Sequence, residues 1–110
     1  MEESSNRIVD LDEILFHPEH LLFFRKKMDD FTVEVFKKVV RANKSGHGLI
    51  KTRLENYHSQ RKHYDRAFTI LEAQGFIDKK EDGTCTPYSV TNRGRQLLKM
   101  LVTEEQQKQN

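Results

Sequence analysis

The sequence predicts a mainly α-helical fold with one small β-hairpin. Apolar residues recur at helical spacing in several segments, and an Asp-Gly turn separates two short β-prone segments near the C-terminus. The chain has 110 residues, which fits one domain and leaves no room for a second independent core. Charged residues make up 33% of it and hydrophobic residues 35%, so we expect a lean core and a heavily charged surface.

The chain divides into four parts. Residues 1–9 carry no periodic pattern, and we expect a flexible arm. Residues 10–30 form an N-terminal helical extension. Residues 31–103 form the domain that holds the hairpin, and residues 104–110 form a polar tail with a frayed end.

Two short helices are expected in the extension. Asp10 and Glu13 match a capping box, which starts a helix through Leu15. Pro18 interrupts this helix and starts the next one, which runs to Met28.

The second of these helices is apolar on all sides. Four consecutive hydrophobic residues point in every direction around a helix, so more than one surface must cover them. The protein's own core and a second copy of the chain are both possible covers, and the cluster is a candidate homodimer element. These residues are Leu21, Leu22, Phe23 and Phe24.

Three helices follow. Asp29 and Asp30 offer an N-cap for a central helix over residues 31–43, and a short helix is expected over residues 49–56. Ser59 is the expected N-cap of the third helix, Ser59–Gln74. Gly75 tolerates a left-handed conformation and ends this helix, with Phe76 folding back on Leu71.

The hairpin and a last helix complete the domain. One strand begins at Phe76, Asp82-Gly83 forms the turn, and the second strand lies over residues 86–90. Pro87 lacks a backbone donor, which favours an edge strand in a two-stranded hairpin. Thr91 caps the last helix, on which Leu97, Leu98 and Leu101 share a face.

This order of elements and several motifs resemble the winged helix-turn-helix DNA-binding superfamily, in particular small prokaryotic and archaeal transcriptional regulators. ILEAQGFIDKK resembles the end of a recognition helix and the first wing strand. YSVTNRGRQLLKML is similar to the tyrosine-x-leucine-threonine-x-x-glycine segment that leads from wing to last helix, with Val90 in place of leucine. LIKTRLENYHSQRKHYDRAFTILEAQGFI resembles small archaeal members. The resemblance implies a recognition helix at Ser59–Gln74 and a wing at Phe76–Val90.

Charge is unevenly distributed along the chain. Residues 1–30 hold eight acidic and four basic side chains, whereas the remainder has a net charge of +6. Residues 44–66 carry six cations against two carboxylates. A polyanionic partner for the second part is one interpretation, and a solvated mixed-charge surface is the other.

The helical wheel places cations opposite the apolar stripe of the Ser59–Gln74 helix. Lys62, Arg66 and Thr69 lie on the outer side, which suits insertion into a major groove that admits one α-helix. Cations of the wing and of the last helix are candidates for phosphate contacts. The candidate DNA-binding residues are Ser59, Arg61, Lys62, His63, Arg66, Thr69, Lys51, Lys79, Lys80, Arg93 and Arg95.

No motif indicates an enzyme, a cofactor or a metal centre. His17 and His20 lack further ligands nearby in sequence, and the one cysteine, Cys85, has no partner for a disulfide. No apolar run reaches the length of a membrane span. We expect a cytoplasmic, nucleoid-associated protein.

Two functional hypotheses follow. The first is a double-stranded DNA-binding transcriptional regulator that forms a homodimer. The alternative is a winged-helix protein–protein interaction module, or a non-specific DNA-organising protein, because fold alone does not establish function.

Overall fold

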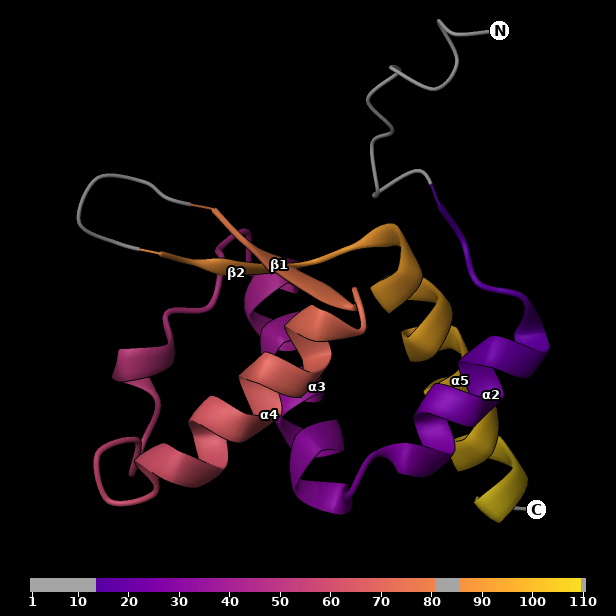
Figure 1. The fold of residues 1–110 in the computed structure, drawn as a ribbon, viewed down its shortest axis with the longest axis horizontal. Helices are drawn as coiled ribbons and strands as arrows, with labels where there is room; N and C mark the ends of the chain where they lie inside the picture. The colour runs from indigo at the N-terminus through magenta and orange to yellow at the C-terminus, as the bar shows by residue number, and fades with distance from the viewer. Residues whose placement is uncertain (1–13, 81–85, 110) are drawn as a thin grey trace, which may run out of the picture.

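The computed structural model describes residues 14–80 and 86–109. This part of the chain is mainly helical with one antiparallel hairpin, as the sequence predicts (Figure 1). The Asp10–Glu13 capping box, the Asp82-Gly83 turn and Cys85 lie outside the described residues. The elements in chain order are α2 (Pro18–Lys27), α3 (Asp30–Lys44), a 3₁₀ helix (Lys51–Arg53), α4 (Arg61–Ala73), β1 (Ile77–Lys79), β2 (Tyr88–Val90) and α5 (Asn92–Gln109).

Local sequence signals start α2, α3 and α5 where they were expected. Pro18 is the first residue of α2. The Asp29 carboxylate accepts a hydrogen bond of 2.8 Å from the Thr32 backbone N–H and caps α3. The hydrogen bonds from Thr32 hold the pKa of Asp29 below its ordinary value. The Thr91 hydroxyl accepts from the Gly94 N–H at 3.0 Å in the first turn of α5.

Helix α4 ends in a Schellman motif, as predicted. Gly75 has a φ of +82°, a left-handed conformation that favours glycine. The Phe76 N–H donates to the Leu71 carbonyl at 2.9 Å, and the Gly75 N–H donates to the Glu72 carbonyl at 3.0 Å. Phe76 and Leu71 are both fully buried, so the chain turns directly from α4 into the core.

The prediction of a short α-helix over residues 49–56 is wrong. Leu49 is extended and forms an antiparallel bridge with Tyr88, and only Lys51–Arg53 forms a single 3₁₀ turn. Asn56 has a φ of +64°, which a continuous right-handed helix does not accommodate. The bridge to a residue far along the chain satisfies the backbone of Leu49, and local sequence does not reveal such a partner.

The expected two-stranded hairpin is confirmed, with Ile77 opposite Val90 and Lys79 opposite Tyr88. The outer side of β2 is nevertheless occupied. Leu49 and Tyr88 exchange hydrogen bonds of 2.9 and 2.8 Å, and the Val90 N–H donates to the Asn43 side-chain oxygen at 2.8 Å. The hairpin is thereby attached to the end of α3.

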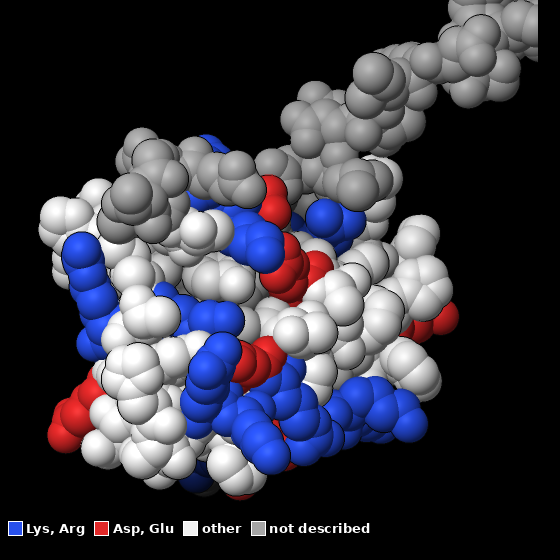
Figure 2. Space-filling view, turned by 60° about the vertical axis from the view of Figure 1, so that its left-hand side comes forward, with Lys and Arg blue, Asp and Glu red and all other residues white. Residues whose placement is uncertain are grey.

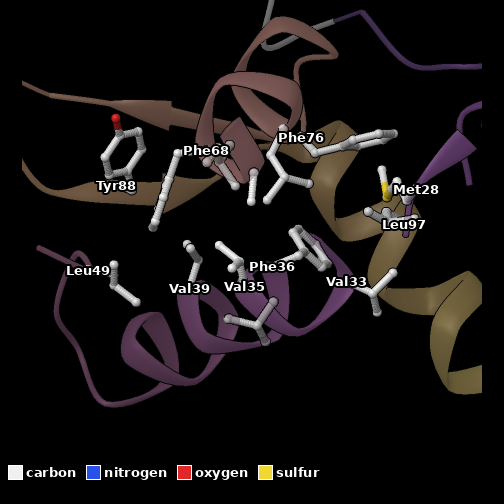
Figure 3. Packing of buried hydrophobic residues seen from close by; sticks show 14 of the residues in the cluster. Met28, Val33, Val35, Phe36, Val39, Leu49, Phe68, Phe76, Tyr88 and Leu97 are labelled. Atoms are coloured by element: carbon white, nitrogen blue, oxygen red, sulfur yellow. The ribbon is translucent and has the colours of Figure 1, made fainter. Parts of the chain in front are cut away.

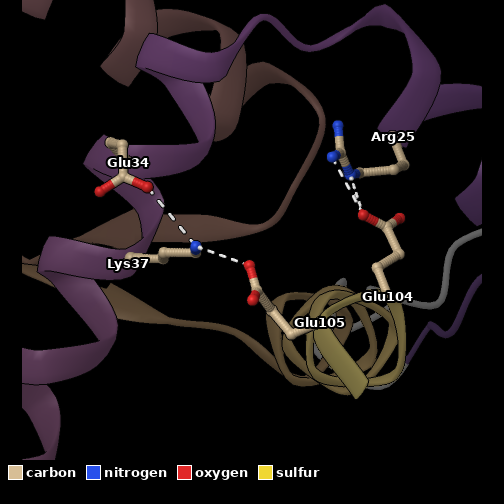
Figure 4. A network of polar contacts seen from close by, with 5 residues as sticks. All are labelled: Arg25, Glu34, Lys37, Glu104 and Glu105. Atoms are coloured by element: carbon tan, nitrogen blue, oxygen red, sulfur yellow. Dashed lines mark hydrogen bonds and ion pairs between the residues drawn. The ribbon is translucent and has the colours of Figure 1, made fainter. Parts of the chain in front are cut away.

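Helix α5 extends further than the sequence suggests. The polar residues 104–109 continue α5 to Gln109. Arg25 of α2 pairs with Glu104 at 3.0 Å, and Lys37 of α3 lies 3.9 Å from Glu105 (Figure 4). These ion pairs connect the last turns of α5 to both neighbouring helices.

The core lies between α3, α4, the hairpin and α5 (Figure 3). Phe36, Phe68, Phe76 and Leu97 come from different parts of the chain, and each is at most 1% exposed. Burial of this apolar surface is the main source of stability for a domain of this size.

The protein's own core covers half of the Leu21–Phe24 cluster. Leu21 is buried, and the Phe24 ring lies 6.2 Å from the Phe76 ring. Leu22 and Phe23 remain 44% and 56% exposed.

Replacement of Gly94 tests the packing of α5 against the end of α4. Alanine ordinarily stabilises a helix by up to about 1 kcal/mol relative to glycine. Here a Cβ at position 94 would lie 2.2 Å from the Phe76 carbonyl oxygen and 2.6 Å from a Val90 methyl group. We therefore expect Gly94→Ala to lower the free energy of unfolding by about 2 kcal/mol, measured by urea denaturation. Lys99→Ala, at an exposed position of the same helix, is the control and should change stability little. A Gly94→Ala protein as stable as the wild type would contradict this packing.

Candidate nucleic-acid interface

Helix α4 has one buried and one exposed side. Tyr64, Ala67, Phe68 and Leu71 are buried against α3 and the hairpin. Lys62, Arg66, Thr69 and Ala73 are exposed on the opposite side. The side chains near the two cations along this ridge are small, so the helix can approach another surface closely.

The start of α4 differs from the prediction. The helix begins at Arg61 with Gln60 as its N-cap, and the Gln60 side chain makes no capping hydrogen bond. Ser59 is therefore not the N-cap, because its hydroxyl donates to the Asn56 carbonyl at 3.0 Å and closes the preceding turn. Ser59 is still exposed beside the helix N-terminus.

Lys62 and Arg66 are the least engaged cations of α4. Neither side chain forms a hydrogen bond or an ion pair within residues 14–80 and 86–109. His63 is exposed, with its ring 5.7 Å from that of Phe31. The two long cations are thus available to an anionic partner.

Asp65 forms ion pairs with two of the other predicted cations. Its carboxylate lies 2.9 Å from the Lys51 ammonium and 3.5 Å from Arg61, and it accepts a hydrogen bond of 2.9 Å from the Tyr57 hydroxyl. The hydrogen bond from Lys51 lowers the pKa of Asp65, and the bond from Tyr57 acts in the same direction. Burial lowers the pKa of Lys51, but the hydrogen bond to Asp65 and other charges outweigh burial and raise it overall. Lys51 and Arg61 are therefore less available than Lys62 and Arg66.

A cavity of about 360 Å³ lies between the 3₁₀ helix and the hairpin. Three cations line it, Lys51, Arg53 and Lys79, and no carboxylate of residues 14–80 or 86–109 is among the lining residues. The remaining lining residues are Ile50, Thr52, Thr86 and Tyr88. Cations with hydroxyl groups are suited to a phosphate group. Arg53 is absent from the predicted site because only the fold brings residue 53 beside residue 79.

The predicted cations of the hairpin and of α5 differ in exposure and in the contacts that they make. Lys79 and Lys80 are exposed on the hairpin. Arg93 is half-buried, donates to the Gly75 carbonyl at 3.2 Å and lies 5.7 Å from the centre of the Phe16 ring, so it serves the packing. Arg95 is exposed, bonds to Asn92 at 3.2 Å and lines a different cavity with Lys44, so it is not part of the α4 surface.

Figure 2 shows the end of the molecule that carries the tip of α4 and the hairpin. Lys and Arg side chains gather on this face, most densely in its lower half, with Asp and Glu side chains beside some of them. The face therefore favours an anionic partner.

The described residues contain no group of three His, Cys, Asp or Glu side chains that could hold a metal ion. The rings of His17 and His20 lie 5.6 Å apart. Among the described residues, no helix is long and apolar enough to span a membrane.

No protein-family model, curated protein or solved structure matches this chain. The resemblance to winged-helix proteins therefore depends on the motifs themselves and remains a prediction.

Replacement of Asp65 tests the ion-pair cluster through pH. A carboxyl group whose pKa is lower in the folded state stabilises the fold above its unfolded value of about 3.9, and this contribution is lost as the pH falls through the folded pKa. We expect Asp65→Asn to reduce stability at pH 7 by at most about 1 kcal/mol, since the side chain is more than a third exposed and solvent screens the pair. Between pH 7 and pH 3, urea denaturation should show a smaller loss of stability in Asp65→Asn than in the wild type. The exposed Asp78→Asn variant is the control and should keep the wild-type pH dependence. Identical pH profiles for Asp65→Asn and the wild type would contradict the role of this cluster.

Proposed function

We propose that the protein binds double-stranded DNA as a transcriptional regulator and places the exposed side of α4 in the major groove. One observation carries the proposal: Lys62 and Arg66 lie on the exposed side of a well-anchored helix and form no ion pair within the described part of the chain. The charge of Arg66 helps to lower the pKa of Asp29, but the two side chains form no ion pair. The order of α3, α4, hairpin and α5 supports it, because these elements follow the order expected for a winged helix, with a 3₁₀ turn in place of the short α-helix before α4.

The residues of α4 have different roles in this proposal. Arg66 presents a planar donor pair that fits the major-groove edge of guanine, and Lys62 reaches a base or the neighbouring phosphate. Thr69 lies on the same side and lets the backbone of the helix approach the groove. Arg61 and His63 flank this ridge and contact the sugar-phosphate backbone.

The cavity beside the hairpin fixes the position of the helix on the duplex. Arg53 and Lys79 hold a backbone phosphate there, with Lys51 as a further donor. Phosphate contacts set register and affinity without reading sequence. Lys80 extends the same contact along the hairpin.

A second function, a protein–protein interaction module, has its own observation. Leu15, Leu22 and Phe23 are large hydrophobic residues that remain exposed at the N-terminal end of the described chain. Exposed apolar side chains that gather in one region often mark a protein contact. Absence of binding to any duplex at low salt would favour this function over DNA binding.

Charge reversal on α4 tests DNA binding. Two lost base or phosphate contacts, at about 1–3 kcal/mol each, predict roughly 100-fold weaker binding or more for Lys62→Glu/Arg66→Glu. Fluorescence anisotropy with labelled duplexes, both random and obtained by in-vitro selection, measures the affinity. The affinity of the wild type should also fall steeply with salt, with a log–log slope of about −0.9 for each neutralised phosphate.

The matched control is Lys99→Glu/Lys108→Glu, which makes the same change in net charge at exposed positions of α5. Screening limits the reach of these charges to about 8 Å at physiological salt, so the control should weaken binding far less. A folded Lys62→Glu/Arg66→Glu protein with unchanged DNA affinity would refute the proposal. Enrichment of a shared motif would indicate sequence-specific binding, whereas binding without enrichment would indicate a DNA-organising protein.

A further inference from the structure

An apolar groove runs between α3 and α5. Two cavities of about 170 and 180 Å³ form it, and both are lined by Val40 and Leu98. Leu101 and Val102 extend the apolar floor at one end, and Val90 extends it at the other. Lys37, Arg41 and Lys44 of α3 form one wall.

The exposed part of this groove is a stripe along α5. Residues 95, 98, 102 and 105 follow one another at spacings of three, four and three, which places them on one side of a helix. Val102 is 47% exposed although it is aliphatic, whereas Leu97 and Leu101 next to it are buried in the core. Helix α2 pairs with α5 through Arg25 and Glu104, and no described residue of α2 lines the groove.

The stripe is complementary to itself in the antiparallel direction. When two copies of α5 lie antiparallel and are centred on residue 100, Leu98 faces Val102 of the second copy. In the same register Arg95 faces Glu105 of the second copy, and the two-fold axis generates each contact twice. Two apolar layers are thus flanked on both sides by opposite charges, the arrangement of a short antiparallel coiled coil.

We propose that a second copy of this chain occupies the groove, with the two α5 helices packed antiparallel through Arg95, Leu98, Val102 and Glu105. The intramolecular contacts of the charged residues permit this. Within the described residues, Arg95 bonds to Asn92 of its own helix at 3.2 Å, and Glu105 lies 3.9 Å from Lys37, the long limit of an ion pair. Both side chains are exposed, and their present contacts can be exchanged for contacts with the second copy.

The length of α5 favours this surface over the exposed residues of α2. Helix α5 has 18 residues, a length of ~27 Å, and offers several layers of side chains. Helix α2 has only 10 residues, and Lys27 lies 5.3 Å from the centre of the exposed Phe23 ring. Two apolar layers make a modest interface, so the dimer should dissociate in the micromolar range.

The dimer leaves the candidate DNA surface free. No residue of α4 lines either cavity of the groove, and α4 and α5 lie on different sides of the molecule (Figure 1). The inference does not depend on DNA binding, since the interface forms from the protein alone.

Charge reversal and its restoration test the register. We expect the purified full chain, without DNA, to dimerise in sedimentation velocity at concentrations up to about 300 µM. Arg95→Glu alone and Glu105→Arg alone each place like charges opposite one another twice, which should weaken the dimer about tenfold. The double variant Arg95→Glu/Glu105→Arg restores opposite charges and should return the dissociation constant to within about threefold of the wild type. Val102→Glu, at an exposed position, should leave a folded monomer, as judged by circular dichroism.

Leu22→Glu/Phe23→Glu is the comparison variant and should still dimerise. A wild type that stays monomeric at the highest concentration would overturn the proposal. The groove between α3 and α5, with its cationic wall, would then fit an acidic segment of another protein. Loss of the dimer in Leu22→Glu/Phe23→Glu, with no effect of the α5 variants, would overturn it in favour of α2. A folded double variant that fails to recover would also overturn it, because the pairing of residues 95 and 105 would then be wrong.

Discussion

The contact between the end of α4 and the start of α5 is the constraint on which the remaining structure depends. The Gly75 carbonyl accepts hydrogen bonds from the Thr91 hydroxyl and from Arg93, and the Phe76 carbonyl accepts from the Thr91 N–H. Gly94 has no Cβ, which lets the first turn of α5 approach the Phe76 carbonyl. The end of α4, both ends of the hairpin and the start of α5 therefore lie together in one small region. The orientation of α4 relative to both neighbours follows from these bonds.

This arrangement also decides which cations remain available. The fold uses Arg93 at the contact itself and pairs Lys51 with Asp65 beside α4. Lys62 and Arg66 lie on the side of α4 that points away from the core, and neither forms an ion pair with a described carboxylate. Surface ion pairs add little stability, so Asp65 mainly places and partly neutralises the charge of its neighbours. Fewer cations are thus available to a partner than the six basic residues within residues 44–66 suggest.

Elements that depend on neighbouring residues could be predicted from the sequence. The Asp29 cap, the Gly75 stop and the Thr91 cap each need bonds that span only a few residues, and all three occur as expected. The short helix over residues 49–56 could not be excluded locally, because Leu49 is held in an extended conformation by Tyr88, 39 positions further along the chain. The pairing of Glu104 in α5 with Arg25 of α2 also joins residues far apart in the chain, which local sequence does not reveal.

The sequence by itself determined the mainly helical class, the hairpin, and the side of α4 on which Lys62 and Arg66 lie, because helical periodicity and local caps are written in consecutive residues. Only the tertiary structure decided that Arg53 and Lys79 share a cavity, that Arg93 belongs to the packing, and that half of the Leu21–Phe24 cluster is covered. These outcomes depend on which distant segments meet. Burial of the common core selects the contacts between these segments, and no short segment specifies them alone.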